Sequence, residues 1–478
     1  AKPPKGQELE DHYFGMIKPR VSAYMKELDE ELWKLGILAK TKHNEVAPSQ
    51  HELAPIFTST NLASDQNQIT MEIMKRVANR HNLVCLLHEK PFAGVNGSGK
   101  HNNWSLSTEE GENLLDPGKT PYENAQFLLF LSAVIKAVNE HQDLLRLSVA
   151  SAGNDHRLGA NEAPPAIVSM FLGEELTEIL EAVANDTSYD GHEKVKMELG
   201  VHVLPKFSKD STDRNRTSPF AFTGNKFEFR MLGSNLSIAG PNIILNTIVA
   251  DVLSQFADEL EKADDFTTEL NELIRRNYKE NEKIIFNGNN YSDEWLVEAE
   301  KRGLKNLLTT ADATPYFETP ENIALFTRHG VLTETEIHSR TEILLDNYCK
   351  VLNIEALTML EMAKKEILPA VLAFSKEVAD TALTKKQLSS GFSTEVEETL
   401  VNKLSSLLGC LQKKIDKLDE VMIHTKEYED VKEASQYYKN SVFTAMQELR
   451  AVADELEVIT GKQYWPFPSY SDLLFSVM

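Results

Sequence analysis

The segment HNEVAPSQHE, residues 43–52, holds two glutamates on either side of a proline. Glu45 and Glu52 are seven residues apart, so one unbroken strand would point them to opposite faces. A turn at residues 48–50 would instead let two adjacent segments bring both carboxylates together. Hard cations such as Mg²⁺ bind oxygen ligands of this kind. The segment therefore predicts either a metal site beside a tight turn or two exposed glutamates there.

A second polar segment, KPFAGVNGSGKHNNWSL, spans residues 90–106. Its glycines would let the main chain approach a ligand closely. The G-x-x-x-x-G-K spacing of a phosphate-binding loop is present, but His101 stands where that loop needs serine or threonine. On a strand, His101, Asn103 and Ser105 would share one face. We interpret the segment as a strand with a candidate metal-binding histidine, not as a P-loop.

Two further segments carry charged residues. In HRLGANEAPPAIVS, residues 156–169, two prolines follow Glu162, which suits either a flap that presents one carboxylate or a solvated loop. In KFEFRM, residues 226–231, charged and apolar side chains alternate, so Glu228 and Arg230 would share one face of a strand. Arg216 lies upstream, in a loop that could bind phosphate. Taken singly, none of the four segments identifies a function.

The composition narrows the class of protein. The 478 residues include 50 Lys and Arg against 73 Asp and Glu, a net charge of −23. Binding to nucleic acid or to a membrane surface requires clustered basic residues, so we expect neither partner. The three cysteines are far apart and match no zinc spacing, and no apolar run is long enough to span a bilayer. We expect a cytoplasmic protein.

The pattern of the sequence changes near residue 330. Before it, strands, turns and helices are mixed, with helical periodicity at residues 20–35, 65–80, 122–146 and 241–262. After it, glycine and proline are rare, and leucines between residues 400 and 422 recur every three or four positions, as in a coiled-coil seam. We expect an α+β fold with one domain at 1–330 and a mostly helical extension at 331–478.

In this order, the four segments resemble the catalytic domain of glutamine synthetase. HNEVAPSQHE is similar to the family's N-G-E-V-x-P-x-Q-x-E, and KPFAGVNGSGKHNNWSL to its K-P-x-x-x-x-N-G-S-G-M-H-x-H-x-S-L. RLGANEAP is similar to the flap R-L-x-x-G-x-E-A-P, and NRTSP and EFRM to N-R-S-A-S and E-x-R-x-P-D. GQELEDHYFG at residues 6–15 and the helical extension resemble the type III enzymes. The resemblance implies a curved antiparallel sheet, half of a barrel, with helices outside.

The resemblance also implies an activity, its cofactors and an assembly. The family makes L-glutamine from L-glutamate, ammonium and ATP through γ-glutamyl phosphate, and uses two or three Mg²⁺ or Mn²⁺ ions per site. Its members are homo-oligomers of stacked rings, and type III members form dodecamers. ATP would then be a substrate of this protein, and its working form would be a ring of subunits.

Individual residues take roles from the same resemblance. It assigns metal binding to Glu45, Glu52, His101 and Glu228; glutamate binding to Asn96, Gly97 and Arg157; nucleotide binding to Asn103, Ser105 and Arg216; and catalysis to Glu162, Arg216 and Arg230. Glu45 and Glu52 would share one ion, and His101 and Glu228 a second. Glu162 would accept a proton from ammonium, and the two catalytic arginines would stabilise the transferred phosphoryl group.

The sequence departs from the family pattern in several places. Before residue 6 we find no counterpart of the family's N-terminal β-grasp domain or of a strand with two more metal-binding glutamates. Arg157 and Glu162 are five apart where the family has six, and Ala221 stands where an arginine is expected. We therefore expect these 478 residues alone to have at most trace activity. Two alternatives stay open: a γ-glutamyl ligase for another amine, and a non-catalytic assembly or regulatory protein on the same scaffold.

Overall fold

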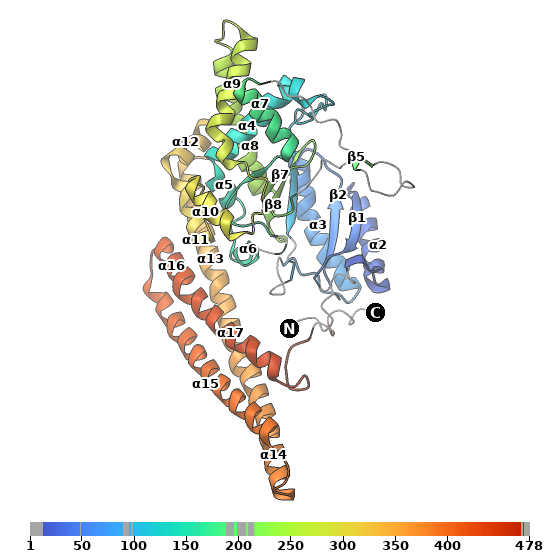
Figure 1. The fold of residues 1–478 in the computed structure, drawn as a ribbon, viewed down its shortest axis with the longest axis vertical. Helices are drawn as coiled ribbons and strands as arrows, with labels where there is room; N and C mark the ends of the chain where they lie inside the picture. The colour runs from blue at the N-terminus through green and yellow to red at the C-terminus, as the bar shows by residue number, and fades with distance from the viewer. Residues whose placement is uncertain are drawn as a thin grey trace. The chain divides into compact units, whose positions relative to one another are not determined.

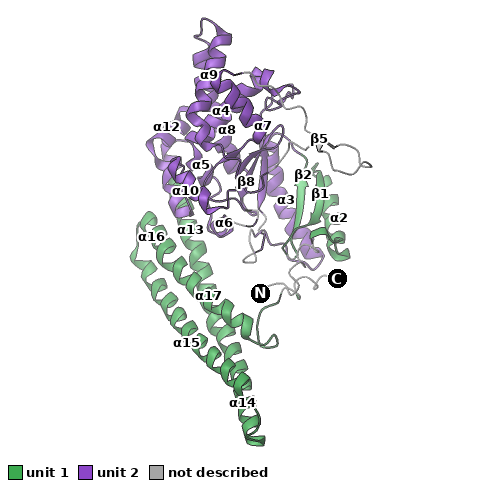
Figure 2. Cartoon of the chain, in the orientation of Figure 1, with its two compact units in different colours: residues 1–56, 339–478 green, residues 57–338 purple. Residues whose placement is uncertain are grey.

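The computed structural model describes residues 13–47, 49–88, 95–96, 99–159, 161, 163–187, 196–197, 207–208, 215–469 and 472. The chain divides into two compact units, drawn in different colours in Figure 2. We call residues 57–338 the sheet unit, because they contain the larger sheet. Residues 1–56 and 339–478 together form the helical unit, which also contains one β-hairpin.

A four-stranded sheet lies in the sheet unit (Figure 1). Its strand order is β3 (Lys100–Trp104), β8 (Phe227–Leu232), β7 (Phe220–Phe222) and β4 (Met170–Phe171). The first three strands are antiparallel neighbours, whereas β4 runs parallel to β7. The expected antiparallel sheet is therefore present in three strands, and β4 makes the whole sheet mixed. A separate antiparallel pair consists of β5 (Lys196–Met197) and β6 (Phe207–Ser208).

The burial of side chains along β3 and β8 can be compared with the alternation that their sequences predict. In β3 the predicted alternation is confirmed, since Trp104 is buried while His101 and Asn103 are exposed. In β8 the alternation fails at Arg230, which is buried together with its apolar neighbours. Arg230 can be buried because its guanidinium contacts the Glu228 carboxylate and the main-chain carbonyls of Asn215 and Ser218.

Ten helices accompany this sheet in the sheet unit, among the described residues (Figure 1). They are α3 (Thr60–Arg80), α4 (Ala125–Glu140), α5 (Gln142–Leu147), α6 (Ala152–Arg157), α7 (Glu174–Asn185), α8 (Ala239–Leu260), α9 (Phe266–Asn281), α10 (Asp293–Lys301), α11 (Thr310–Ala313) and α12 (Pro320–Arg328). α4 packs against α8 and α9, α7 packs against α9, and α12 packs against α8. Pro241 lies in the first turn of α8, where its missing N–H leaves no hydrogen bond unmade.

The single long helix expected at 122–146 is wrong in one respect, because it is two helices. α4 ends at Glu140, and His141 has φ −118° and ψ 34°, outside the helical region, before α5 begins. The His141 imidazole lies 3.2 Å from the Asn322 side-chain oxygen of α12. Apolar periodicity continues across the break, so the pattern alone did not reveal it.

The helical unit begins with α2 (Pro19–Trp33) and a hairpin of β1 (Ala39–Asn44) and β2 (His51–Pro55). α2 buries the apolar side chains that its periodicity predicts, Val21, Met25, Leu28 and Leu32. A half-buried ion pair between Lys42 of β1 and Asp29 of α2 links the hairpin to the helix. The hairpin is therefore held on one side by α2.

Long helices make up the rest of this unit. They are α13, which begins in the sheet unit (Glu334–Met362), α14 (Leu368–Leu388), α15 (Glu395–His424), α16 (Val431–Tyr437) and α17 (Phe443–Ile459). α15 packs against α14 and α17 and buries the predicted seam, with Leu404, Leu411 and Leu418 fully enclosed. The predicted α+β class with a helical C-terminal region is confirmed. Within the described ranges, no helix combines the length and apolarity that crossing a bilayer requires.

Candidate functional site

Three potential metal ligands meet on the β1–β2 hairpin, and we call His43, Glu45 and Glu52 the hairpin cluster. The register places His43 directly opposite Glu52. Glu45 follows two residues after His43, on the same face, and its main-chain N–H continues the ladder by donating to the Gln50 carbonyl at 2.8 Å. One ligand atom from each residue lies within 4.8 Å of the other two. The expected turn therefore does bring the two glutamates together.

The ring of His43 is oriented by the main chain. Its Nδ1 lies 2.7 Å from the Asn44 carbonyl oxygen, while Nε2 faces the Glu52 carboxylate and lies 3.8 Å from Glu45. Burial opposes the charged imidazole, but the Asn44 carbonyl and the two carboxylates raise the pKa of His43 overall. We did not single out His43 from the sequence. The His-x-Glu spacing on a strand, which puts both residues on one face, was the available signal.

A second group, the sheet cluster, consists of His101 on β3 and Glu228 and Arg230 on β8. His101 Nδ1 lies 3.4 Å from Glu228 Oε1. Arg230 donates from Nε to Glu228 Oε2 at 2.8 Å, and its Nη2 lies 2.7 Å from the same oxygen in an ion pair. Burial by itself would raise the pKa of Glu228, but His101 and Arg230 lower it to about 2. The sheet thus holds an ionised carboxylate between an imidazole and a guanidinium.

Arg230 is almost entirely enclosed, with 2% of its surface exposed. Its Nη1 donates to the main-chain carbonyls of Asn215, at 2.6 Å, and Ser218, at 3.3 Å. These two residues flank Arg216 and Thr217 in the segment before β7. The guanidinium of Arg230 therefore joins the carboxylate of Glu228 to the turn that carries Arg216.

Arg157, at the end of α6, is buried to a similar degree, with 1% of its surface exposed. Its guanidinium donates to the main-chain carbonyls of Leu232, at 3.2 Å, and Arg230, at 3.0 Å. Gly99 lies directly against it, because a Cβ at that position would collide with the guanidinium and with the Leu232 carbonyl. Arg157 thus ties α6 to β8 here, and its role towards a substrate stays a prediction.

The remaining predicted residues lie apart from these contacts or outside the described residues. Asn103 and Ser105 are exposed with His101, as the strand pattern predicts, and the Ser105 hydroxyl donates to Asn113 at 2.7 Å. Asn96 is half-buried, and Arg216 is exposed on its turn. Glu162 and Gly97 lie outside the residues that the structure describes.

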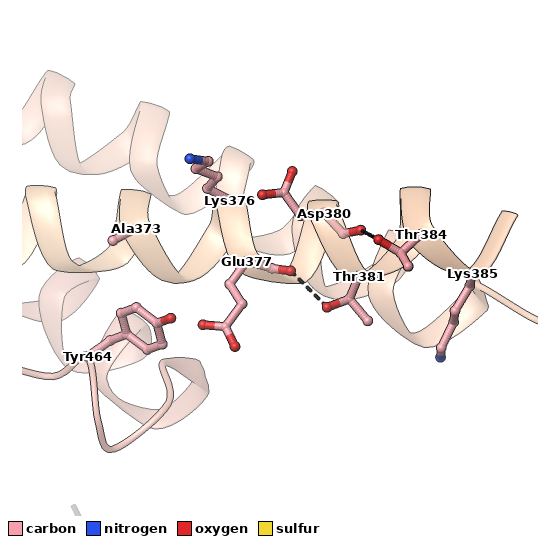
Figure 3. Close-up of a pocket in the computed structure, with 8 residues that line it drawn as sticks. All are labelled: Ala373, Lys376, Glu377, Asp380, Thr381, Thr384, Lys385 and Tyr464. Carbon is pink, nitrogen blue, oxygen red and sulfur yellow. Dashed lines mark hydrogen bonds between the residues drawn. The ribbon is translucent and has the colours of Figure 1, made fainter. Parts of the chain in front are cut away.

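A separate hollow on the helical unit contains none of the predicted site residues (Figure 3). Its volume is about 570 Å³, and it is lined by Ala373, Lys376, Glu377, Asp380, Thr381, Thr384, Lys385 and Tyr464. Both threonine hydroxyls donate to carbonyls of their own helix, Thr381 to Glu377 at 2.9 Å and Thr384 to Asp380 at 2.8 Å. Because its charges are mixed and these hydroxyls are already bonded, we do not assign the site to this hollow.

Comparison with protein families gives two matches along the chain. The glutamine synthetase catalytic domain matches residues 5–168, a range that contains the hairpin cluster and His101. The glutamine synthetase C-terminal domain matches residues 269–386. Both matches agree with the resemblance drawn from the four segments.

Individual relatives extend this agreement over almost the whole chain. The glutamine synthetase of Butyrivibrio fibrisolvens is 50% identical over 99% of this chain and 68% of its own length. The type-3 glutamine synthetase of Dictyostelium discoideum is 45% identical over 99% of this chain and 66% of its own length. Among solved structures, one titled "Apo GmaS without ligand" aligns with a TM-score of 0.44 at 17% identity, over 70% of this chain and 63% of that chain. The chain spans about two thirds of the length of these curated relatives, and at this level of identity it belongs to the glutamine synthetase family.

Proposed function

We propose that the protein ligates ammonium to L-glutamate in an ATP-dependent reaction that gives L-glutamine, ADP and phosphate through γ-glutamyl phosphate. The observation that carries this proposal is that Glu228 contacts both His101 and Arg230. The chain that contains these three residues belongs to a family of ligases. These contacts set a potential metal-binding pair beside a guanidinium suited to phosphate. Phosphoryl transfer depends mainly on such positioning and charge neutralisation.

Both clusters have donor sets that fit divalent cations. Glu45 and Glu52 would hold one ion, with His43 as a further ligand, because its Nδ1 is engaged by the Asn44 carbonyl and its Nε2 is left facing the carboxylates. His101 and Glu228 would hold a second. Bound Mg²⁺ or Mn²⁺ would neutralise charge on the ATP phosphates, and an imidazole among carboxylates is compatible with either ion.

The two arginines would act on the transferred phosphoryl group in different ways. Arg216 is exposed on its turn, so its guanidinium could reach a ligand directly. Arg230 uses Nε, Nη1 and Nη2 within the protein, so it would contribute mainly its fixed positive charge. Charge that is already oriented stabilises a transition state without reorganising during the reaction.

The other substrate contacts rest on the family resemblance. Asn96, Gly97 and Arg157 would bind L-glutamate, and Glu162 would accept a proton from ammonium while the flap excludes water. Arg157 is 1% exposed, so a substrate carboxylate would reach its guanidinium only after a local rearrangement. Asn103 and Ser105, which share the exposed face of β3 with His101, would contact the nucleotide.

The test is ATP-dependent phosphate release by the protein purified from its native source, with every residue that it carries there. We expect release to require both glutamate and ammonium. Glu52→Ala and Glu228→Ala should each lower the rate by about a hundredfold or more, since each removes a ligand. Glu110→Ala, an exposed glutamate in the turn after β3, is the matched control and should leave the rate unchanged.

Two outcomes would favour the alternatives. Faster release with glutamate and a bulkier amine than with ammonium would identify a γ-glutamyl ligase for that amine. Absence of release from the native protein, with either amine, would favour a non-catalytic assembly or regulatory role on this scaffold.

The proposed setting follows the family. We propose a cytoplasmic homo-oligomer of stacked rings, most simply a dodecamer, with a catalytic domain at 1–330 and a helical extension at 331–478. Native mass spectrometry would give the number of subunits directly. We propose neither nucleic acid nor membrane as a partner, in keeping with the net charge of −23.

A further inference from the structure

We infer that residues 287–290, the NGNN loop, form a positioning element that sets the turn of residues 215–218 and, through it, Arg230 and Arg216. The inference rests on the proposed function, because it concerns the arginines that would face the transferred phosphoryl group. The loop lies between the 3-10 turn Glu282–Ile284 and α10, about 70 residues after the turn that it holds.

The loop begins from a rigid base. Phe286, the residue before it, stacks on the buried Trp295 of α10, with ring centroids 3.8 Å apart and planes 15° apart. Its main-chain N–H donates to the Met170 carbonyl of β4 at 2.8 Å. The Arg302 guanidinium lies 5.8 Å from the centre of the Phe286 ring. These contacts fix the direction in which the loop leaves the sheet.

Asn287 fastens the first part of the loop to the start of α7. Its side-chain oxygen accepts from the main-chain N–H groups of Leu172, at 3.2 Å, and Gly173, at 3.1 Å. Its side-chain nitrogen donates to the Thr177 hydroxyl at 2.9 Å. With both ends of its amide engaged, Asn287 cannot rotate without breaking hydrogen bonds.

Asn290 fastens the second part of the loop to the turn. It is 1% exposed, and its side-chain oxygen accepts from the Ser169 hydroxyl at 2.7 Å. Its main-chain N–H donates to the Thr217 hydroxyl oxygen at 3.0 Å, and its side-chain nitrogen lies 3.3 Å from the same atom. A buried amide of this kind costs stability unless its hydrogen bonds are made, so the site favours one arrangement.

Asn215 is the residue of the turn that hydrogen-bonds to the main chain of the NGNN loop. Its side-chain nitrogen donates to the main-chain carbonyls of Asn287, at 3.2 Å, and Gly288, at 2.7 Å. Its side-chain oxygen accepts from the Thr217 hydroxyl at 2.7 Å. Its φ is +29°, a positive value that asparagine tolerates better than most residues other than glycine. The hydrogen bonds to the NGNN loop hold Asn215 in this conformation.

The turn contacts the sheet cluster through the main-chain carbonyl of Asn215. Asn215 directs its main-chain oxygen to Nη1 of Arg230, at 2.6 Å, while Glu228 holds the other side of the same guanidinium. Arg216 lies between Asn215 and Thr217, both of which the loop contacts. Asn215, Asn287 and Asn290 are therefore positioning residues, which act through the two arginines.

The test uses two variants and a matched control in the native protein. Asn290→Ala removes the side-chain contacts to Thr217 and Ser169, and Asn215→Gly removes the amide while allowing the positive φ. Asn289→Ala is the control, because Asn289 is an exposed asparagine of the same loop. Within the part of the chain that the structure describes, its side-chain oxygen accepts from the nearby main-chain N–H of Tyr291. Hydrogen exchange of the 215–219 peptide and steady-state kinetics are measured for each.

We expect both variants to exchange faster at 215–219 and to lose between about tenfold and about a hundredfold in kcat, with KM for glutamate changed by less than about twofold. Asn289→Ala should match the wild type in both measurements. General destabilisation would speed exchange throughout residues 57–338 and not at 215–219 alone, so the exchange data distinguish it from release of the turn. Asn215→Gly keeps the test valid should Asn290→Ala fold poorly.

Unchanged exchange in both variants would overturn the inference whatever their activity. Faster exchange with unchanged kcat would also overturn it, because the turn would then have been released without any effect on the reaction. A wild-type protein without ATP-dependent phosphate release would instead overturn the proposed function, and exchange would still report whether the loop holds the turn.

Discussion

His43 shows how much the neighbours of one side chain determine its chemistry. Histidine at a strand end is commonly a polar surface residue, but here its Nδ1 faces a main-chain carbonyl and its Nε2 faces two carboxylates. A metal-binding histidine usually has this arrangement, because a hydrogen bond at one ring nitrogen leaves the lone pair of the other for the ion.

We therefore predict that His43→Asn weakens binding of Mn²⁺ at the hairpin cluster by between about tenfold and about a hundredfold. Isothermal titration of the native protein with MnCl₂ would measure this as the loss of one class of site. His424→Asn is the matched control, since His424 also lies 2.7 Å from a glutamate, Glu427, but on an exposed helix end. Equal affinity in the His43 variant and the wild type would exclude His43 as a ligand.

Glu228 and Arg230 show what the spacing of residues along one strand can predict and what it cannot. Their spacing correctly predicted one strand and a shared face. The alternation did not predict that Arg230 would be buried, nor that its guanidinium would hold a turn. Arg230 is buried against the main-chain carbonyls of Asn215 and Ser218, and the alternation within β8 carries no information on that contact.

Among the helices, α8 and α12 are joined by a charged contact. Asp251 of α8 accepts from Arg328 Nε at 3.0 Å and lies 2.6 Å from His329 Nε2, while Gln255 donates to it at 2.9 Å. Burial would raise the pKa of Asp251, but these partners lower it overall. The carboxylate is therefore more acidic in the folded protein than in the unfolded chain.

This contact should contribute a pH-dependent part of the stability. A lowered folded pKa stabilises the protein fully above the unfolded value, about 4, and the contribution disappears as the pH falls through the folded value. We predict that Asp251→Asn lowers the free energy of unfolding by about 1–3 kcal/mol at pH 7, and that the difference shrinks below about pH 4. Urea unfolding at several pH values would measure it.

Asp264→Asn is the control for this prediction, because it makes the same change of charge at an exposed position after α8. It should leave the unfolding curve nearly unchanged at every pH. A difference between Asp251→Asn and the wild type that grows as the pH falls would contradict the assignment.

The helices themselves were largely predictable. Apolar spacing located α2, α3, α8 and α15 because an amphipathic helix repeats its buried face every 3.6 residues. Apolar spacing did not predict the break at His141. The helical repeat of apolar residues continues on both sides of it, although the backbone of this one residue is not helical.

At the scale of the whole molecule, the chain forms two compact units. Each has its own enclosed leucines, for example Leu245 of α8 in the sheet unit and Leu411 of α15 in the helical unit, both 0% exposed. Units with separate cores open separately when one core is weakened.

We predict that Leu245→Ala and Leu411→Ala each remove about 2–5 kcal/mol of local stability. Hydrogen exchange followed by mass spectrometry should show faster exchange within residues 57–338 for Leu245→Ala, and within 339–460 for Leu411→Ala. The two substitutions remove the same atoms, so each serves as the control for the other. Faster exchange in both units from either variant would indicate one cooperative unit.

Local pattern was sufficient for much of this protein. Helical periodicity predicted α15 and its buried seam, and alternation predicted that His101 and Asn103 of β3 would share one face. The spacing of Glu45 and Glu52 left two interpretations open, and the folded hairpin shows that the two carboxylates meet. The first two predictions depend only on residues within a few turns of one helix or within one strand, so short-range sequence pattern is enough to make them.

Contacts between segments that are distant in the sequence became known only from the folded structure. Arg230 is enclosed against the main-chain carbonyls of Asn215 and Ser218 in the turn before β7. The contacts of Asn287 and Asn290 with the same turn join residues more than 70 positions apart. No periodicity records which loop will lie against which turn. That choice is made when the sheet and its helices pack, because only then do buried amides and carbonyls find partners.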